Sequence, residues 1–129
     1  MDAEDAVDPD TRRRLFWAVC VPVRVGLATG ALVIGARAPQ LLLYVGIYAA
    51  LTAAAFAVNA MRAHAGGKRT GGLGGAVWWA RMRYVHVVLW AACAALALRR
   101  VRWAGAVLAV DAFAGAAAGA LHYRRGMCR

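Results

Sequence analysis

Three ionisable side chains stand deep inside long apolar stretches of this chain: Arg24, His86 and Asp111. A charged group in hydrocarbon is costly unless it is paired or lines a polar cavity, so each of them needs a partner or a task. At 1.5 Å of helical rise per residue, Arg24 lies about 14 Å and Asp111 about 12 Å from the end of its stretch. Because His86 falls at a similar depth, the three side chains can meet near the middle of a membrane.

This buried polar site has two interpretations. In the functional one, an Arg24–Asp111 ion pair with His86 beside it binds an anion, a lipid headgroup or a proton. In the structural one, Arg24 and Asp111 neutralise each other and fix the register of the helices, and a buried pair needs no further purpose than this. We favour the structural interpretation.

A second polar pattern lies in the third apolar stretch, where four residues are spaced i, i+4, i+7 and i+11: Trp79, Arg83, His86 and Trp90. This spacing places them on one helical face. Arg83 and His86 can donate to an anion or a lipid headgroup between tryptophan walls, or the stripe can simply pack against neighbouring helices. Arg81 points elsewhere and can extend towards the inner headgroups.

The first stretch contains Cys20 and Arg24 one turn apart, with Pro22 between them. Proline removes the hydrogen bond to the carbonyl of Ala18, so Cys20 and Pro22 are expected to mark a helix kink. The arginine can satisfy such a carbonyl. A reactive thiolate at Cys20 is the less favoured alternative.

Pairs of glycines with GxxxG spacing occur in the first and last stretches, at Gly26 and Gly30 and at Gly115 and Gly119. Such spacing permits two helix backbones to approach closely. Chance is an equal explanation in a chain this rich in alanine and glycine. If the glycines do pack together, they bring Arg24 close to Asp111.

The sequence predicts no catalytic residue, metal site or cofactor. The three cysteines are far apart and lack metal-ligand spacing, and the three histidines fall at different depths, which disfavours a bis-histidine haem. The net charge is +10, but the arginines sit mostly in short loops between apolar stretches. We therefore expect anionic lipid headgroups as partners and no nucleic acid, and association between copies of the chain stays open.

Four apolar stretches of about 20 residues must position these groups, at 15–36, 40–61, 76–98 and 103–123. This length lets a helix cross a bilayer. Apolar and polar residues do not alternate along these stretches as they would in a strand. We predict an all-α fold, an integral membrane antiparallel four-helix bundle formed as one domain by residues 15–129. Residues 1–14 are predicted to be a mobile polar tail. The short linkers 37–39 and 99–102 should make consecutive helices neighbours.

Positive charge predicts the orientation, because loops on the cytoplasmic side are enriched in Lys and Arg. One side would carry nine such residues: Arg12, Arg13, Arg14, Arg62, Lys68, Arg69, Arg124, Arg125 and Arg129. The other would carry four: Arg37, Arg99, Arg100 and Arg102. Both termini are therefore predicted to be cytoplasmic, although the RRVR turn opposes this orientation.

Three segments carry a family resemblance: CVPVR at 20–24, GGAVWWARMRYVH at 74–86 and DAFAG at 111–115. They resemble the CxPxR, GGxxWWxxxRxxH and DxxxG motifs of uncharacterised small four-span membrane proteins of large DNA viruses of algae. The resemblance covers all but the second helix and the tails, and it implies a fold and no reaction. The small multidrug exporters differ, since they carry a carboxylate in their first helix where this chain has Arg24.

Taken together, these patterns indicate a small polytopic membrane protein with a structural or lipid-interacting role. The alternative is a transporter or channel subunit in which Arg24, His86 and Asp111 handle protons or an anion. An enzyme acting on a lipid is the least favoured interpretation, because no paired carboxylates and no nucleophile–base pair are present.

Overall fold

The computed structural model describes residues 8–65 and 82–126, and these residues are helical almost throughout. The elements are the helices α1 (Pro9–Leu15), α2 (Val21–Arg37), α3 (Leu42–His64), α4 (Met82–Leu98) and α5 (Gly105–Gly126), with the π-helical segment η2 (Phe16–Cys20) and the 3₁₀ turn η3 (Pro39–Leu41). No strand occurs in these described ranges. The predicted all-α fold is confirmed.

Three helical stretches are long and apolar enough to cross a membrane: Asp10–Arg37, Pro39–His64 and Gly105–Arg125. The apolar helix α4 is described from Met82 onwards, so residues 76–81 of the predicted span 76–98 lie outside the described residues. These helices support an integral membrane protein, and the fourth crossing stays a prediction.

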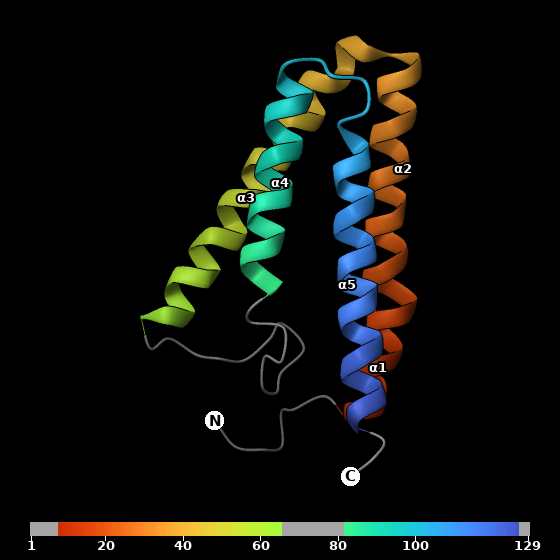
Figure 1. The fold of residues 1–129 in the computed structure, drawn as a ribbon, viewed down its shortest axis with the longest axis vertical. Helices are drawn as coiled ribbons and strands as arrows, with labels where there is room; N and C mark the ends of the chain where they lie inside the picture. The colour runs from red at the N-terminus through yellow and green to blue at the C-terminus, as the bar shows by residue number, and fades with distance from the viewer. Residues whose placement is uncertain (1–7, 66–81, 127–129) are drawn as a thin grey trace.

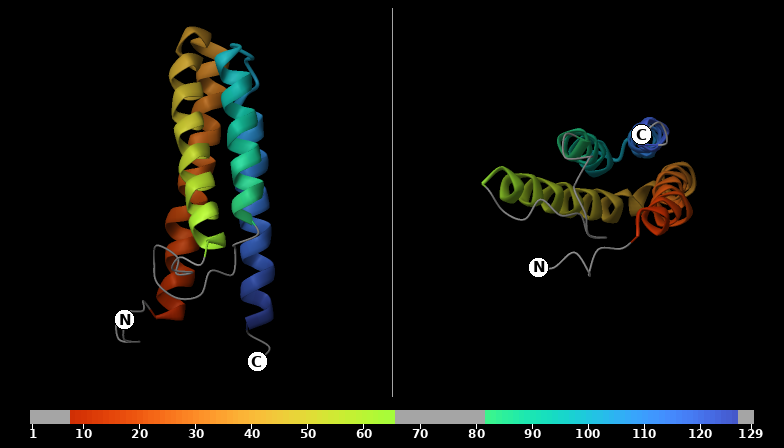
Figure 2. Two further views of the ribbon diagram at one scale, coloured as in Figure 1. Left: turned by 90° about the vertical axis from the view of Figure 1, so that its left-hand side faces the viewer. Right: turned by 90° about the horizontal axis from the view of Figure 1, so that it is seen from below.

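The helices form two closely packed pairs, α3 with α4 and α2 with α5 (Figures 1 and 2). The described ends of α1, α3, α4 and α5 that lead to the termini and to residues 66–81 lie at one end of the bundle (Figure 1). Helices α2 and α3 follow each other through a tight turn, yet they diverge and touch little. The prediction that they would be neighbours is therefore wrong beyond the turn, because a short linker fixes only the junction between two helices.

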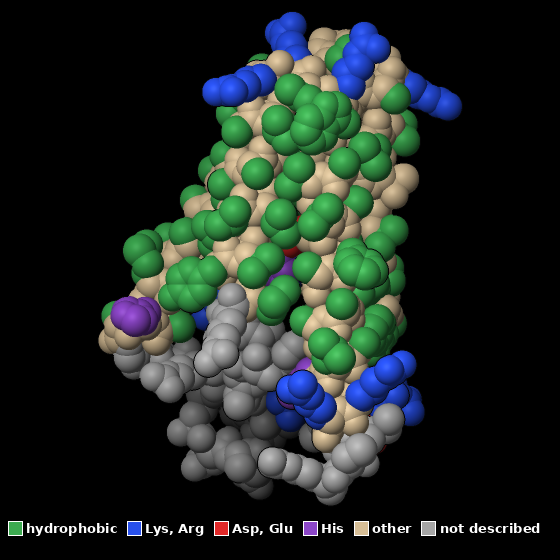
Figure 3. Space-filling model, in the orientation of Figure 1, with side chains coloured by type: hydrophobic (Ala, Val, Ile, Leu, Met, Phe, Trp, Pro, Cys, Tyr) green, Lys and Arg blue, Asp and Glu red, His purple; other side chains and the backbone are tan. Residues whose placement is uncertain are grey.

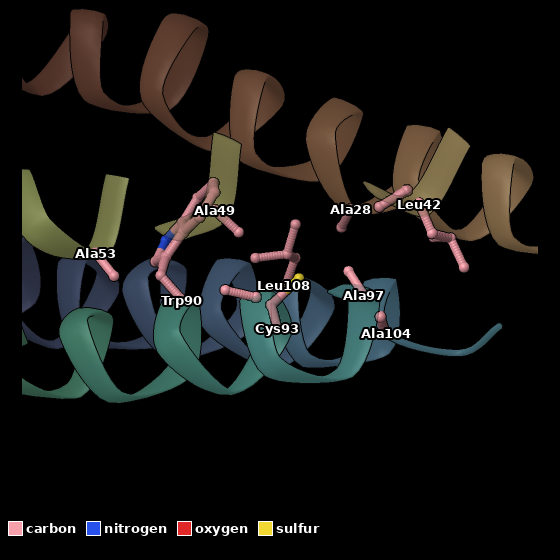
Figure 4. Close-up of a cluster of buried hydrophobic side chains, with 11 residues drawn as sticks. Ala28, Leu42, Ala49, Ala53, Trp90, Cys93, Ala97, Ala104 and Leu108 are labelled. Atoms are coloured by element: carbon pink, nitrogen blue, oxygen red, sulfur yellow. The ribbon is translucent and has the colours of Figure 1, made fainter. Parts of the chain in front are cut away.

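The core consists mainly of small side chains, whereas large apolar side chains point outwards. Figure 4 shows this core, which contains Ala28, Ala31, Leu42, Ala49, Ala53, Trp90, Cys93, Ala94, Ala97, Ala104 and Leu108. On the outside, Leu51 is 67% and Phe113 is 76% exposed. Figure 3 shows hydrophobic side chains along the visible face and Lys or Arg side chains at its two ends. This arrangement fits lipid as the surrounding medium, because small interface residues let helix backbones pack closely in a bilayer.

The contact between α2 and α5 uses only the glycines of α5 among the four that their spacing suggested. A side chain added at Gly26 or Gly30 would meet nothing within 4 Å, so these two residues do not form the interface, and that expectation is wrong. Gly115 and Gly119 do face α2 and η2, against Arg24 and Phe16. Spacing shows that two glycines share a face of a helix, but it does not show which face meets the partner.

The closest approach of the two helices is at the start of α5. A Cβ added at Gly105 would lie 2.7 Å from the backbone nitrogen of Leu32 and 3.0 Å from the carbonyl oxygen of Ala28. Nearby, a Cβ at Gly35 would collide with the backbone of Arg102. Glycine is thus required at these positions by backbone contact rather than by an unusual φ angle.

The first helix begins earlier than the polar composition suggested. Asp8 accepts a hydrogen bond from the backbone N–H of Thr11 at 3.2 Å, and Pro9 occupies the first helical turn. Both are signals of a helix N-terminus. The prediction of a mobile tail over residues 1–14 is therefore wrong from Pro9 onwards, and residues 1–7 lie outside the described residues.

An irregular turn precedes the proline of the first long helix. In the π-helical segment η2, which ends at Cys20, the backbone N–H of Val21 donates to the carbonyl of Phe16, five residues earlier. Pro22 follows directly in the first turn of α2. The structure thus has a widened turn directly before Pro22, and the kink expected at Cys20 and Pro22 stays a prediction.

The turn between α4 and α5 places an arginine where helices usually end with glycine. Arg100 has a φ of 58°. Its N–H donates to Ala97, and the N–H of Val101 donates to Leu96, which is the Schellman pattern of a helix C-terminus. This turn returns the chain antiparallel to α4.

The glycine at the start of α5 gives a test of the interface. We expect Gly105→Ala to destabilise the protein by about 1–3 kcal/mol, the usual cost of overpacking, because the atoms it would meet belong to a backbone that cannot swing aside. Denaturant unfolding in detergent micelles measures this. Gly30→Ala is the matched control and should cause no loss of stability. Equal effects of the two substitutions would contradict the described interface.

Candidate functional site

The structure brings Arg24 of α2, His86 of α4 and Asp111 of α5 together. Arg24 Nη1 lies 3.3 Å from Asp111 Oδ2, and His86 Nδ1 bonds to Asp111 Oδ1. The side chains of Asp111 and His86 are buried, at 1% and 4% exposure, whereas that of Arg24 is 25% exposed. Three helices therefore converge on one carboxylate.

A fourth residue joins this cluster, because Trp90 Nε1 donates to Asp111 Oδ2 at 3.2 Å. The sequence pattern predicts only an apolar wall at Trp90. Its position one turn after His86 on the same helical face is the signal that could have identified it as a donor. Asp111 thus accepts from an arginine, a histidine and a tryptophan, and we call these four residues the Asp111 network.

The ring of His86 contacts both ionisable partners. Its Nε2 lies 3.2 Å and its Nδ1 3.3 Å from Arg24 Nη1, so this guanidinium nitrogen is nearly equidistant from the two ring nitrogens. A carboxylate only accepts hydrogen bonds, so the ring nitrogen that meets Asp111 Oδ1 must carry hydrogen. We therefore assign a proton to Nδ1, which donates to Asp111.

Aromatic side chains of α3 close the network on one side. The ring of Phe56 lies 5.5 Å from that of His86, and the ring of Tyr48 lies 6.0 Å from that of Trp90. The sequence pattern predicts no site residue in this helix. Neither residue could have been found from depth alone, because the direction in which each points around the helix decides the contact.

Space for the arginine depends on a missing side chain in α5. A Cβ added at Gly115 would lie 2.9 Å from Arg24 Nη1 and 3.8 Å from His86 Cε1. Glycine at this position lets the guanidinium reach the carboxylate. Further along, Gly119 faces the ring of Phe16.

The second predicted site is only partly within the described residues. Arg83 is 7% exposed, and its Nη1 donates to the carbonyl of Asn59 at 3.2 Å, which joins α4 to α3. His86 belongs to the Asp111 network, and Arg81 and Trp79 lie outside the described residues. An anion or headgroup site at Arg81, Arg83 and His86 therefore stays a prediction.

The two described cysteines differ in their exposure. Cys20 is exposed and Cys93 is buried in the apolar core, and Cys128 lies outside the described residues. Within residues 8–65 and 82–126, no group of three or more His, Cys, Asp or Glu side chains is arranged to hold a metal ion.

Comparison with protein families, curated proteins and solved structures found no match to this chain. The resemblance to viral four-span proteins therefore stays a prediction. The function has to be inferred from the geometry of the Asp111 network and from its setting in apolar helices.

The glycine beside the arginine gives a test of the network. We expect Gly115→Ala to displace the Arg24 guanidinium and to lower stability by about 1–3 kcal/mol, the cost of a buried polar group that loses its partner. Chemical unfolding in detergent measures the loss. Gly26→Ala on the open face of α2 should leave stability unchanged. A Gly115→Ala protein as stable as the control would show that Arg24 does not need this position.

Proposed function

We propose that this chain is a non-catalytic, structural multi-pass membrane protein whose helices are held in register by the Asp111 network. The proposal rests on one observation, which is that the buried carboxylate of Asp111 accepts hydrogen bonds from several helices at once. Asp111 is 1% exposed and meets three donors, one from α2 and two from α4.

A closed network suits a structural role better than transport. A transported proton or anion needs a group that exchanges its partners during each cycle. Hydrogen bonds to a charged group contribute about 1.5–3 kcal/mol each, and a buried group left without its partner costs a similar amount. Exchanging any protein donor of Asp111 for a transported species would therefore disturb the contact between helices.

In this proposal the surrounding lipids are the main partners. The outward apolar side chains meet the hydrocarbon, and arginines at both ends of the bundle meet anionic headgroups. The chain would cross the bilayer four times with both termini in the cytoplasm, as the nine-to-four distribution of positive charges favours.

A transporter or channel subunit is the second candidate, and one observation favours it. Arg24 is 25% exposed while its two ionisable partners are buried, so part of the network is accessible from outside the protein. A substrate could then approach the network through the arginine without the helices separating.

Substitutions at Asp111 and Arg24 test whether the two residues form a pair with a structural role. We expect Asp111→Asn to lower the free energy of unfolding by about 3 kcal/mol or more, because it leaves Arg24 without its counter-ion in an apolar setting. The double variant Arg24→Leu/Asp111→Leu should lose less, since no charge is left unpaired. Unfolding in detergent compares the three proteins. A double variant less stable than the single one would contradict the structural role.

Flux measurements test the alternative proposal of a transporter or channel subunit. If the network is structural, proteoliposomes should show no flux of protons or small anions that depends on Asp111, as followed with pH-sensitive and anion-sensitive dyes. Flux through the wild type that Asp111→Asn abolishes while the protein stays folded would overturn the structural proposal and support a carrier or channel.

The four-span orientation has its own test. In a background without Cys20, Cys93 and Cys128, cysteines placed at Thr11 and at Arg125 should react with an impermeant maleimide only from the cytoplasmic side. A cysteine at Arg100 should react only from the opposite side. Labelling of Thr11→Cys and Arg125→Cys from different sides would mean an odd number of crossings and would refute the proposed topology.

A further inference from the structure

The chain crosses between the two helix pairs at one end of the bundle only. One pair is α2 with α5, and the other is α3 with α4. The crossings are η3, which joins α2 to α3, and residues 99–104, which join α4 to α5. Both lie at the end shown at the top of Figure 1, which we call the turn end. Residues 66–81 lead from α3 to α4 within one pair, so the backbone makes no crossing at the opposite end, the terminus end.

The apolar core lies on the turn side of the Asp111 network. In each helix that contributes to the network, the core residues lie between the network residue and the turn end. They are Ala28 and Ala31 in α2, Cys93, Ala94 and Ala97 in α4, and Ala104 and Leu108 in α5. Because the same cluster includes residues of α3, it joins the two pairs to each other on this side.

On the terminus side, two contacts hold each pair together internally. The ring of Phe16 lies 5.8 Å from that of Tyr123, which joins η2 to α5. Arg83 donates to the carbonyl of Asn59, which joins α4 to α3. The two pairs diverge towards this end (Figure 1). The Asp111 network therefore lies where the pairs begin to separate.

The polar contacts of the network differ in the helices that they join. The bond between Arg24 and Asp111 stays within the pair of α2 and α5. The bonds of Asp111 with His86 and Trp90 cross from this pair to α4, as does the contact of Arg24 with the His86 ring. Each of these crossing contacts uses His86 or Trp90, and we call these two side chains the latch.

We propose that the turn end is a hinge between the two helix pairs, and that the latch holds their terminus ends together. Hinges are a few residues in loops or at the ends of elements, and the two crossings supply such residues. Rotation about them separates the terminus ends while the core on the turn side stays in contact. The bundle thus opens in one direction, and Asp111 becomes accessible from the terminus end.

This inference rests on the structural role of the Asp111 network, and it assigns the two sides of that network different tasks. Arg24 compensates the charge of Asp111 within one pair. His86 and Trp90 are positioning residues, because they set how far the second pair lies from the first on the terminus side.

Distances between spin labels measure such a rotation. The test uses full chains without the native cysteines in phosphatidylcholine nanodiscs. One label pair is at Tyr84→Cys and Leu121→Cys on the terminus side, and the other is at Ala95→Cys and Val110→Cys on the turn side. All four positions are exposed, and each label pair joins α4 to α5. By helical rise, the first label pair is roughly four times as far from the turn end as the second.

Removing the latch should lengthen the distance on the terminus side. Trp90→Phe loses the indole N–H but keeps a ring against Tyr48, and His86→Phe keeps a ring against Phe56. We expect each variant to lengthen the Tyr84–Leu121 label distance about four times as much as the Ala95–Val110 distance, because rotation moves distant points further. Trp103→Phe, the same change at an exposed tryptophan of the turn end, should alter neither distance.

Each other outcome overturns the proposal. Equal lengthening of both distances would show that the pairs separate as a whole, without a hinge. Unchanged distances in a folded Trp90→Phe protein, or an equal change in Trp103→Phe, would show that the latch does not hold the pairs together. If His86→Phe does not fold, Trp90→Phe decides. The unfolding measurements at Asp111 judge the structural role separately, because they report whether the network stabilises the fold and not which helices move.

Discussion

The carboxylate of Asp111 is the constraint on which the arrangement of the helices depends. A buried carboxylate is tolerated in an apolar medium only when charge and hydrogen bonds compensate it. Here the compensation comes from Arg24 on α2 and from His86 and Trp90 on α4. Because each donor belongs to a helix other than α5, satisfying the carboxylate and assembling the helices are one event.

The pairing of η2 and α2 with α5 is fixed at three levels along the helices. At one end Gly105 lies against the backbone of α2, in the middle Gly115 makes room for Arg24, and towards the other end Gly119 faces Phe16. Each level relies on a glycine that admits a neighbouring group. In lipid there is little hydrophobic drive for helices to associate, so close packing and polar contacts provide it. The small core and the large outer side chains follow from the same requirement.

Much of this arrangement could be predicted from the sequence, because a membrane-crossing chain must satisfy its backbone within each segment. That requirement turns long apolar stretches into helices, and helical rise then places Arg24, His86 and Asp111 at similar depth. Rotation of the helices about their axes could not be predicted, so the open face of Gly26 and Gly30 and the donor role of Trp90 were missed. Asp8 followed by Pro9 is a signal of a helix N-terminus. The charged residues around this signal nevertheless favoured the prediction of a polar tail.

The π turn before α2 has a consequence for the way the chain can change. One residue corresponds to about 100° of rotation in an α-helix, and a π turn accommodates roughly one residue more than an ordinary turn. Deleting one residue within Phe16–Cys20 would therefore convert the widened turn into an ordinary α-helical turn. The helix faces presented by α1 on one side and by Arg24 on the other would both be retained.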